Sequence, residues 1–254
     1  MSRHSRGTSK ERVVGGLHPV RELLRSGQTV TSVLVAETRD RGAVLDDILE
    51  LARAAGVTVE QVDRRDLDAR AVGLVHQGVL ALAPPFSYTS LAVVVASASD
   101  HGEDPFLVAL DGVTDPHNLG SIARSAEAVG VHGLVVPQRR SAAVTPTVEK
   151  SAAGALAYLP VVQVVNLVRA LQELRDAGVW SIGLDEQASH ELAGVALASE
   201  PCVLVVGGEG GGLSRLTRDR CDALARLPMR GRVASLNASV AAAVALYELR
   251  RLRG

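Results

Sequence analysis

The chain has 254 residues, of which 47% are hydrophobic and 2% aromatic, and its formal net charge is −1. This length and hydrophobic content support one large or two modest hydrophobic cores. The sequence contains no run of about 18 apolar residues and no apolar N-terminal segment, so we expect no membrane span and a cytoplasmic location. The two cysteines and seven histidines lack the spacing of zinc, CxxC or HExxH sites, which argues against a metal enzyme.

The small net charge argues against a protein that is basic throughout, but it conceals two basic segments. Residues 213–254 contain nine arginines and three acidic residues, a net charge of +6. Residues 1–12 contain four basic residues and one acidic residue, a net charge of +3. These segments are either solvated surface or contacts for an anionic partner such as RNA. Because residues 1–11 show no apolar periodicity, we expect them to form a flexible basic arm.

Residues 12–83 show the alternating patterns of a small α/β domain. Leucine and valine recur on one helical face between Leu17 and Leu24. Further along, the pattern predicts strands and one helix, and then a polar segment before the last strand. The predicted strands are Val30–Ala36, Val57–Val62 and Gly78–Ala83, the helix is Ala43–Ala55, and the polar segment is Asp63–Arg70.

Pro84 and Pro85 interrupt regular structure, and we expect residues 84–105, with a helix near Tyr88–Ser99, to link this domain to a second one at 106–254. In the second domain, apolar strands alternate with helical segments. The predicted strands are Phe106–Leu110, Gly133–Val136, Val179–Leu184, Val203–Val206 and Ala223–Leu227. This alternation predicts a mostly parallel sheet with helices on both faces, and ligands of such sheets bind at the carboxyl ends of the strands.

The first distinctive motif follows the strand that ends at Asp111. A turn-rich loop leads to Asn118, which we expect to cap a helix that carries Arg124. Both side chains would then project toward the loop. An ordinary surface ion pair of Arg124 with Asp115 or Glu127 is the alternative interpretation.

The second motif is the glycine-rich loop after the strand Val203–Val206. Gly207 and Gly208 let a ligand approach the backbone closely. The loop fits neither the GxGxxG nor the GxxxxGK[ST] pattern, so an NAD or ATP site is not expected. Glu209 is a carboxylate among glycines, where it would accept hydrogen bonds from neighbouring loops or orient a cation.

The third motif is a loop that leads into the C-terminal helix. Leu227, Met229 and Leu236 supply apolar surface, and Ser235 and Asn237 supply short polar groups. This mixture suits a flat heteroaromatic ligand with a ribose. An ordinary terminal helix with a polar N-cap explains the stretch equally well when it is considered alone.

In form and order, the three motifs resemble those of the SpoU, or TrmH-like, family of SPOUT methyltransferases. The resemblance covers residues 106–254 and reaches residues 13–83 more loosely. It implies a C-terminal SPOUT domain with a parallel sheet and a deep trefoil knot, preceded by a small L30e-like RNA-binding domain. It also implies S-adenosylmethionine as the cofactor, no metal, and a homodimer. The layout is most similar to the RlmB-type members, which methylate a guanosine ribose 2′-hydroxyl of 23S rRNA.

The same resemblance assigns roles to ten residues. The positions implied to be catalytic are Asn118, Arg124, Glu209, Ser235 and Asn237. The positions implied to bind the cofactor are Gly207, Gly208, Leu227, Met229 and Leu236. Arg124 occupies the position often assigned as the base, but a guanidinium stays charged near neutral pH. We therefore expect it to stabilise negative charge on the ribose O2′ and to hold the adjacent phosphate. The resemblance further implies that the methyl donor that Arg124 serves is held mainly by the other subunit's loops.

Few aromatic residues are available for base stacking, so RNA recognition is expected to use shape, phosphate and 2′-OH contacts. The expected contacts are the N-terminal arm, the small domain, Arg230, Arg232 and neighbouring arginines. A tRNA methyltransferase and a self-resistance rRNA methyltransferase of an antibiotic producer remain alternatives. So does a non-catalytic RNA-binding or ribosome-assembly protein. A nucleotide-dependent oxidoreductase or kinase is disfavoured by the failed phosphate-loop patterns.

Overall fold

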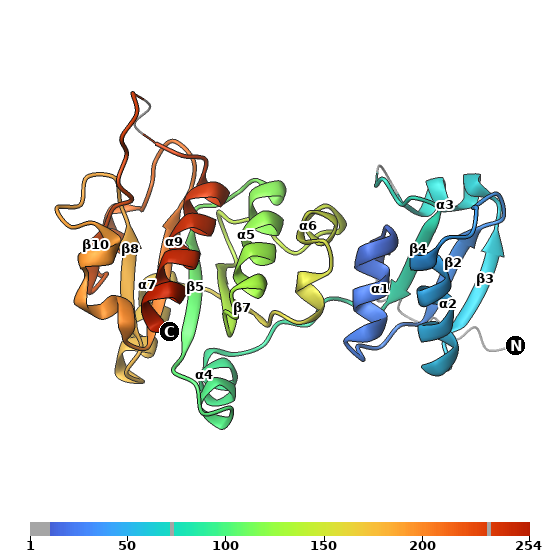
Figure 1. Cartoon of the computed structure of the whole chain (residues 1–254), viewed down its shortest axis with the longest axis horizontal. Helices are drawn as coiled ribbons and strands as arrows, with labels where there is room; N and C mark the ends of the chain where they lie inside the picture. Colours follow the sequence, from blue (N-terminus) through green and yellow to red (C-terminus); the bar gives the residue numbers. More distant parts are fainter. Residues whose placement is uncertain (1–10, 72–73, 233–234) are drawn as a thin grey trace, which may run out of the picture. The chain divides into compact units, whose positions relative to one another are not determined.

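The computed structural model describes residues 11–71, 74–232 and 235–254. Its contacts divide the chain into two compact units between Ser87 and Tyr88 (Figure 1). This division falls within the predicted linker, residues 84–105, whose helix α4 (Leu91–Asp100) is part of the second unit. Apart from Glu11, the predicted basic arm lies outside the described residues.

The N-terminal unit contains a four-stranded mixed sheet with the order β1-β4-β2-β3. Strand β4 is antiparallel to both of its neighbours, whereas β2 and β3 are parallel. Helices α1 and α2 follow β1 and β2, and α3 follows β3. The bounds are β1 Arg12–Gly15, α1 Leu17–Arg25, β2 Ser32–Ala36, α2 Ala43–Ala54, β3 Thr58–Val62, α3 Arg64–Ala71 and β4 Val79–Ala83.

Side-chain alternation along β2 explains how both faces of this sheet are covered. Val33 and Val35 pack into one cluster with residues of α1 and α2, whereas Leu34 packs into a second cluster with Leu67 of α3. Two elements of this unit were not expected from the sequence. The polar segment Asp63–Arg70 is mostly helix α3, which is anchored by its buried Leu67, and residues Arg12–Gly15 form strand β1.

The C-terminal unit is built on a six-stranded sheet with the order β10-β8-β9-β5-β6-β7, and every pair of neighbours is parallel. The central strands β5 and β9 are almost entirely buried, as expected for a parallel sheet covered on both faces. The bounds are β5 Phe106–Asp111, β6 Gly133–Pro137, β7 Val161–Val164, β8 Trp180–Leu184, β9 Cys202–Gly207 and β10 Ala223–Ala225. Strand β7 was not predicted.

Helices cover the two faces of this sheet. Helices α4 and α7 pack in one apolar cluster with Leu107 of β5. Helices α5 and α9 lie side by side (Figure 1). Arg253 of α9 stacks on Phe106 of β5, and the Phe106 side chain points to the face of the sheet opposite to that of Leu107. The remaining helical bounds are α5 Pro116–Ala128, α6 Pro146–Ala152, η1 Ala155–Ala157, α7 Leu167–Asp176, η2 Leu192–Gly194, η3 Ala196–Ser199, α8 Arg215–Arg218 and α9 Ala238–Arg253.

The N-termini of α5 and α9 decide how their asparagines are used. Asn118 is not the cap of α5, contrary to the prediction. The Oδ1 atom of Asp115 accepts the cap hydrogen bond from the His117 backbone N–H at 2.9 Å, so Asn118 lies inside the first turn, where it is 5% exposed. Asn237 does cap α9, as its Oδ1 atom accepts from the backbone N–H of Ser239 at 2.9 Å.

The structure confirms the predicted fold class: an α/β chain whose C-terminal part carries a parallel sheet and whose N-terminal part is a small α/β unit. Within residues 11–71, 74–232 and 235–254, every helix is too short or too polar to span a lipid bilayer. The loops after β5, β8, β9 and β10 all leave from the carboxyl edge of the parallel sheet, which is where a ligand is expected.

Candidate functional site

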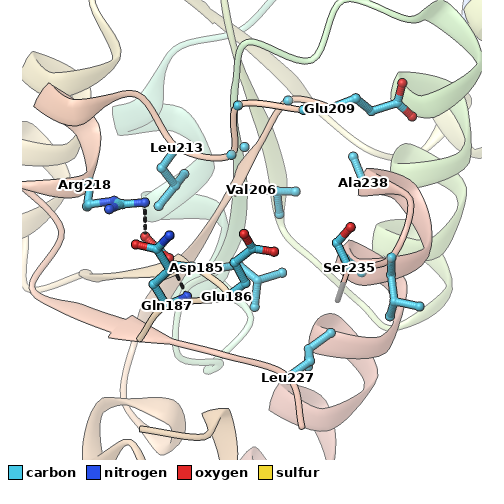
Figure 2. A pocket seen from close by; sticks show the side chains of 18 of the residues that line it. Asp185, Glu186, Gln187, Val206, Glu209, Leu213, Arg218, Leu227, Ser235 and Ala238 are labelled. Carbon is cyan, nitrogen blue, oxygen red and sulfur yellow. Dashed lines mark hydrogen bonds and ion pairs between the residues drawn. The ribbon is translucent and has the colours of Figure 1, made fainter. Parts of the chain in front are cut away.

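A cavity of about 410 Å³ lies at the carboxyl ends of β8 and β9, beside the loop that leads into α9 (Figure 2). It is lined by three segments that are distant in the sequence: the loop after β8, the glycine-rich loop after β9 and the residues before α9. Seven of the ten predicted site residues line it, namely Gly207, Gly208, Glu209, Leu227, Met229, Ser235 and Leu236. All five residues predicted to bind a cofactor are among them.

The glycines of the loop after β9 are required by close backbone approaches. A Cβ atom on Gly207 would overlap the backbone of Gly212, and one on Gly208 would overlap the carbonyl of Gly112. The Gly208 N–H donates to the Asp111 carbonyl at 2.8 Å, and the Gly212 N–H donates to the Gly208 carbonyl at 3.1 Å. The loop therefore folds back on itself and lies against the loop after β5, which leaves its backbone as one wall of the cavity.

One carboxylate joins the three predicted motifs. The Oε1 atom of Glu209 accepts hydrogen bonds from the side-chain amides of Asn118, at 2.8 Å, and of Asn237, at 2.6 Å. The Asn237 amide also donates to the Asn118 Oδ1 atom at 3.1 Å. Each of the three residues bonds to the other two, although the chain separates Asn118 from Asn237 by 119 positions. Asn118 and Asn237 do not line the cavity themselves, but they hold Glu209 at its rim.

The charges around the cavity favour a cationic ligand. Three carboxylates line it, those of Asp185, Glu186 and Glu209, against the single guanidinium of Arg218. Arg218 pairs with Asp185 at 2.7 Å, the contact marked in Figure 2. Glu186 and Glu209 are thus left to act on a bound molecule. Apolar side chains also line the cavity, namely Leu184, Leu213, Leu227, Met229 and Leu236.

Sequence reasoning missed the polar residues of this cavity that follow β8. Asp185, Glu186 and Gln187 line it, as does Arg218 of α8. The available signal was their position directly after the predicted strand Val179–Leu184, because the carboxyl ends of parallel strands share one edge of the sheet. Arg218 carried no such signal, since only the tertiary structure brings α8 to Asp185.

Arg124 is the predicted site residue that the structure does not bring to this cavity. It lies six residues after Asn118 on α5, about 9 Å further along the helix axis. Its side chain is exposed, and within the described part of the chain it makes no hydrogen bond or ion pair. The Arg124 guanidinium is consequently accessible from solvent and does not line this cavity.

Neither cysteine offers a reactive thiolate to this site. Burial raises the pKa of the Cys221 thiol to about 12, and the nearby carboxylates of Asp222 and Asp111 also raise it. Burial likewise raises the pKa of Cys202 to about 11, against the opposing effect of Arg253. Both thiols stay protonated near neutral pH, which disfavours them as nucleophiles and as metal ligands. In the described ranges no three His, Cys, Asp or Glu residues cluster as metal ligands would.

The Glu209 network makes a prediction about stability. Glu209→Ala should lower the free energy of unfolding of the C-terminal unit by about 1–3 kcal/mol, because the buried Asn118 amide loses its acceptor. That loss corresponds to roughly 2–4 °C per kcal/mol in the thermal midpoint. Glu209→Gln keeps an acceptor oxygen and should retain most of the stability. Thermal unfolding followed by circular dichroism measures both.

The matched control is Glu186→Ala, because Glu186 is exposed, lines the same cavity and makes no hydrogen bond or ion pair with the described residues. Its thermal midpoint should stay within about 1 °C of the unchanged protein, as is usual for exposed sites. Equal midpoints for Glu209→Ala and Glu186→Ala would show that the network contributes nothing to folding.

Comparison with known proteins agrees with both units. Residues 105–247 match the SpoU rRNA Methylase family, and residues 13–89 match the family described as RNA 2′-O ribose methyltransferase substrate binding. YacO of Bacillus subtilis (strain 168), a candidate TrmH family tRNA/rRNA methyltransferase, is 41% identical over 238 residues, 94% of either chain. A protein of Mycolicibacterium vanbaalenii named as an uncharacterized tRNA/rRNA methyltransferase is 43% identical over 251 residues, which cover 99% of this chain and 79% of that one.

Solved structures show the same two-unit fold. The SpoU methyltransferase AviRb from Streptomyces viridochromogenes superposes with a TM-score of 0.80 at 28% identity, covering 99% of this chain and 93% of that chain. The complex of AviRb with the cofactor AdoMet superposes with a TM-score of 0.78 at 29% identity, covering 100% of this chain and 94% of that chain. An AdoMet-bound rRNA methyltransferase from Sinorhizobium meliloti superposes with a TM-score of 0.76 at 25% identity, covering 95% of this chain and 87% of that chain. The resemblance, the methyltransferase activity and the cofactor predicted from the motifs are confirmed, and the chain belongs to the SpoU family of S-adenosylmethionine-dependent RNA methyltransferases.

Proposed function

We propose that this protein transfers a methyl group to a ribose 2′-hydroxyl of RNA, and that its target is a guanosine of 23S rRNA. The observation that carries the proposal is the hydrogen-bonded set of Asn118, Glu209 and Asn237 at the rim of the cavity. The match of residues 13–89 to an RNA 2′-O ribose methyltransferase substrate-binding family supports ribose as the acceptor. An rRNA substrate agrees with the expected cytoplasmic location.

The cavity suits S-adenosylmethionine in shape and in charge. A volume of about 410 Å³ lies within the usual range for small-molecule sites. Leu227, Met229 and Leu236 offer apolar walls for an adenine ring, and the backbone of Gly207 and Gly208 allows close approach. The carboxylates of Glu186 and Glu209 favour a molecule that carries a sulfonium and an ammonium group.

S-adenosylmethionine, held by the residues that line the cavity, would supply an activated methyl group for the ribose O2′, whose proton would have to leave. The protein's contribution is to place the ribose and to stabilise the charge that develops on O2′. We assign the second role to Arg124, whose permanently charged guanidinium donates hydrogen bonds to O2′ and to the neighbouring phosphate. The proton then passes to the phosphate or to water late in the step. The hydrogen bonds among Asn118, Glu209 and Asn237 keep the rim of the cavity in shape, and Ser235 lines the cavity.

A homodimer would bring Arg124 to a cavity. Helices α5 and α9 lie side by side, and α9 exposes an apolar stripe of Val240, Val244 and Tyr247, which are 48%, 48% and 57% exposed. Residues at this spacing share one helical face. We propose that this stripe is buried against a second copy and that Arg124 of one subunit serves its partner's cavity. We propose that Arg230 and Arg232, which are exposed in the loop before α9, contact the RNA. The trefoil knot stays a prediction.

The experiment that tests the proposal is incubation of the purified protein with labelled S-adenosylmethionine and either unmodified 23S rRNA or total tRNA, followed by digestion to nucleosides. The expected product is 2′-O-methylguanosine at one site of 23S rRNA. Label in tRNA alone would keep the chemistry and replace the substrate, an outcome that the tRNA/rRNA names of the relatives make worth testing. Cofactor binding without label would point to a ribosome precursor as the substrate. A protein that binds RNA but no cofactor would instead be a non-catalytic RNA-binding or assembly protein.

A further inference from the structure

A second cavity, of about 490 Å³, lies at the carboxyl ends of β5, β6 and β7. The glycine-rich loop lines both cavities, through Gly208, Glu209, Gly211 and Gly212. The first cavity thus occupies the β8–β9 part of the carboxyl edge, the second occupies the β5–β7 part, and Glu209 belongs to both. No role has been assigned so far to the second cavity.

Two arginines contribute positive charge to this cavity. Arg139 and Arg140 line it beyond the end of β6, and both side chains are exposed. Within the described ranges, neither guanidinium has a carboxylate partner. Two carboxylates also line the cavity, and neutral groups donate to both: Asp111 accepts from the Ser214 N–H at 2.7 Å, and Glu209 accepts from the two asparagine amides. Among the described residues the two guanidinium groups therefore have no ion pair and are accessible to an anionic ligand.

The arginine-bearing loop is held in place from both sides. The Gln138 N–H donates to the Val164 carbonyl at the end of β7, at 2.9 Å, and the Ala142 N–H donates to the Val113 carbonyl in the loop after β5, also at 2.9 Å. Between these anchors, Arg140 has a φ of 58°, a left-handed conformation that is unfavourable for a residue with a side chain. Such strain persists where surrounding structure enforces it, often at ligand sites.

Apolar surface completes the cavity. Val165 is 82% exposed and Leu216 is 70% exposed, and both line it. Single exposed apolar residues are common on protein surfaces. Here two of them line the same cavity as two arginines that have no ion pair among the described residues, a combination that suits the apolar and anionic groups of a nucleotide. The guanidinium groups suit a phosphodiester, and the apolar side chains suit the face of a base or a sugar.

We propose that the second cavity binds a nucleotide of the RNA substrate that neighbours the methylated one, with its phosphate on Arg139 and Arg140 and its base against Val165 and Leu216. This inference rests on the proposed function, because the reacting ribose would then lie at Glu209, where the two cavities meet. The glycine-rich loop, which lines both cavities, then lies between the two sites.

The test measures binding of unmodified 23S rRNA and of a tRNA transcript by filter binding over a series of salt concentrations. The double variant Arg139→Glu and Arg140→Glu should bind RNA at least about 10-fold more weakly, with a slope of log K against log salt reduced by about 1–2, one phosphate contact each. A control for net charge is Arg220→Glu, which replaces one exposed arginine before β10 and outside both cavities and so changes the charge by half as much as the double variant. If direct contacts rather than net charge determine RNA affinity, the affinity of this control variant should change by less than about twofold.

Two further readouts separate binding from folding. Arg140→Gly relieves the left-handed backbone, so its thermal midpoint should be unchanged or higher while its RNA affinity falls. S-adenosylmethionine affinity, measured by calorimetry, should be unaffected in all of these variants. If the double variant binds RNA as tightly as Arg220→Glu does, and the protein still methylates RNA, RNA binding by the second cavity is overturned and the proposed function stands. If the double variant loses RNA binding selectively but the unchanged protein transfers no methyl group, the second cavity is supported and the proposed function is overturned.

Discussion

Arg124→Ala is expected to lower the single-turnover rate of methyl transfer by about 100-fold or more, the usual effect of removing a donor at a developing oxyanion. The stability of the protein should stay unchanged, because the Arg124 side chain is exposed and has no partner among the described residues. Arg124→Lys keeps the charge but not the planar pair of donors, so it should recover only part of the rate. Nearly full activity in Arg124→Lys, with only a tenfold loss in Arg124→Ala, would contradict the assigned role.

A mixed dimer decides in which subunit Arg124 acts. Differently tagged subunits, one carrying Arg124→Ala and the other Glu209→Ala, are purified as the heterodimer. If Arg124 serves its partner's cavity, one of the two sites keeps both residues, and the heterodimer should show about half of the activity of the unchanged dimer. Both homodimeric variants should be nearly inactive. A heterodimer as inactive as they are would place Arg124 and Glu209 in the same subunit's site.

Gly207→Ala is expected to abolish measurable cofactor binding and to reduce methyl transfer by at least about 100-fold, since displacements of about 1 Å at a reacting site have that effect. The new Cβ would overlap the backbone of Gly212, and neither backbone segment can yield without moving the wall of the cavity. Overpacking of this kind also costs about 1–3 kcal/mol of stability. Calorimetric titration with S-adenosylmethionine and thermal unfolding measure the two effects.

The same loop provides the control. Gly211 also lines the cavity, but a Cβ there would meet no atom within 4 Å, and its φ is not positive. Gly211→Ala should therefore change the stability by no more than about 0.5 kcal/mol. Its cofactor affinity should stay close to that of the unchanged protein. Similar losses of cofactor binding in Gly207→Ala and Gly211→Ala would show that general loop flexibility, rather than the contact with Gly212, supports the site.

The glycine-rich loop shows how far a pattern alone can reach. Its position after a buried strand predicted a close backbone approach, and the residues that the motifs pointed to do line one cavity. The pattern could not identify what approaches, which is chiefly the loop's own residue Gly212 and the neighbouring Gly112. The residues after β8 were also missed, because polar residues at the end of a strand look like any surface loop in the sequence.

Helix geometry explains the errors around α5. Aspartate and asparagine are about equally good N-caps, so sequence favoured Asn118 although Asp115 and Pro116 form the actual start of the helix. The shift matters because it buries Asn118 in the first turn, where it reaches Glu209. Six residues on a helix with 3.6 residues per turn correspond to about 120° between side chains, so Arg124 cannot face the same way as Asn118.

The sequence by itself determined the class of the fold, the parallel sheet, the three loops at its carboxyl edge and the family, because these follow from apolar periodicity and from local motifs. Only the tertiary structure decided which polar groups meet: Glu209 with two asparagines far apart in the chain, Asp185 with Arg218, and Arg139 and Arg140 in a second cavity. The physical reason is that hydrogen bonds and ion pairs depend on positions within a few tenths of an ångström. Periodicity determines which face of an element is buried, whereas the packing of whole elements determines what each polar atom contacts.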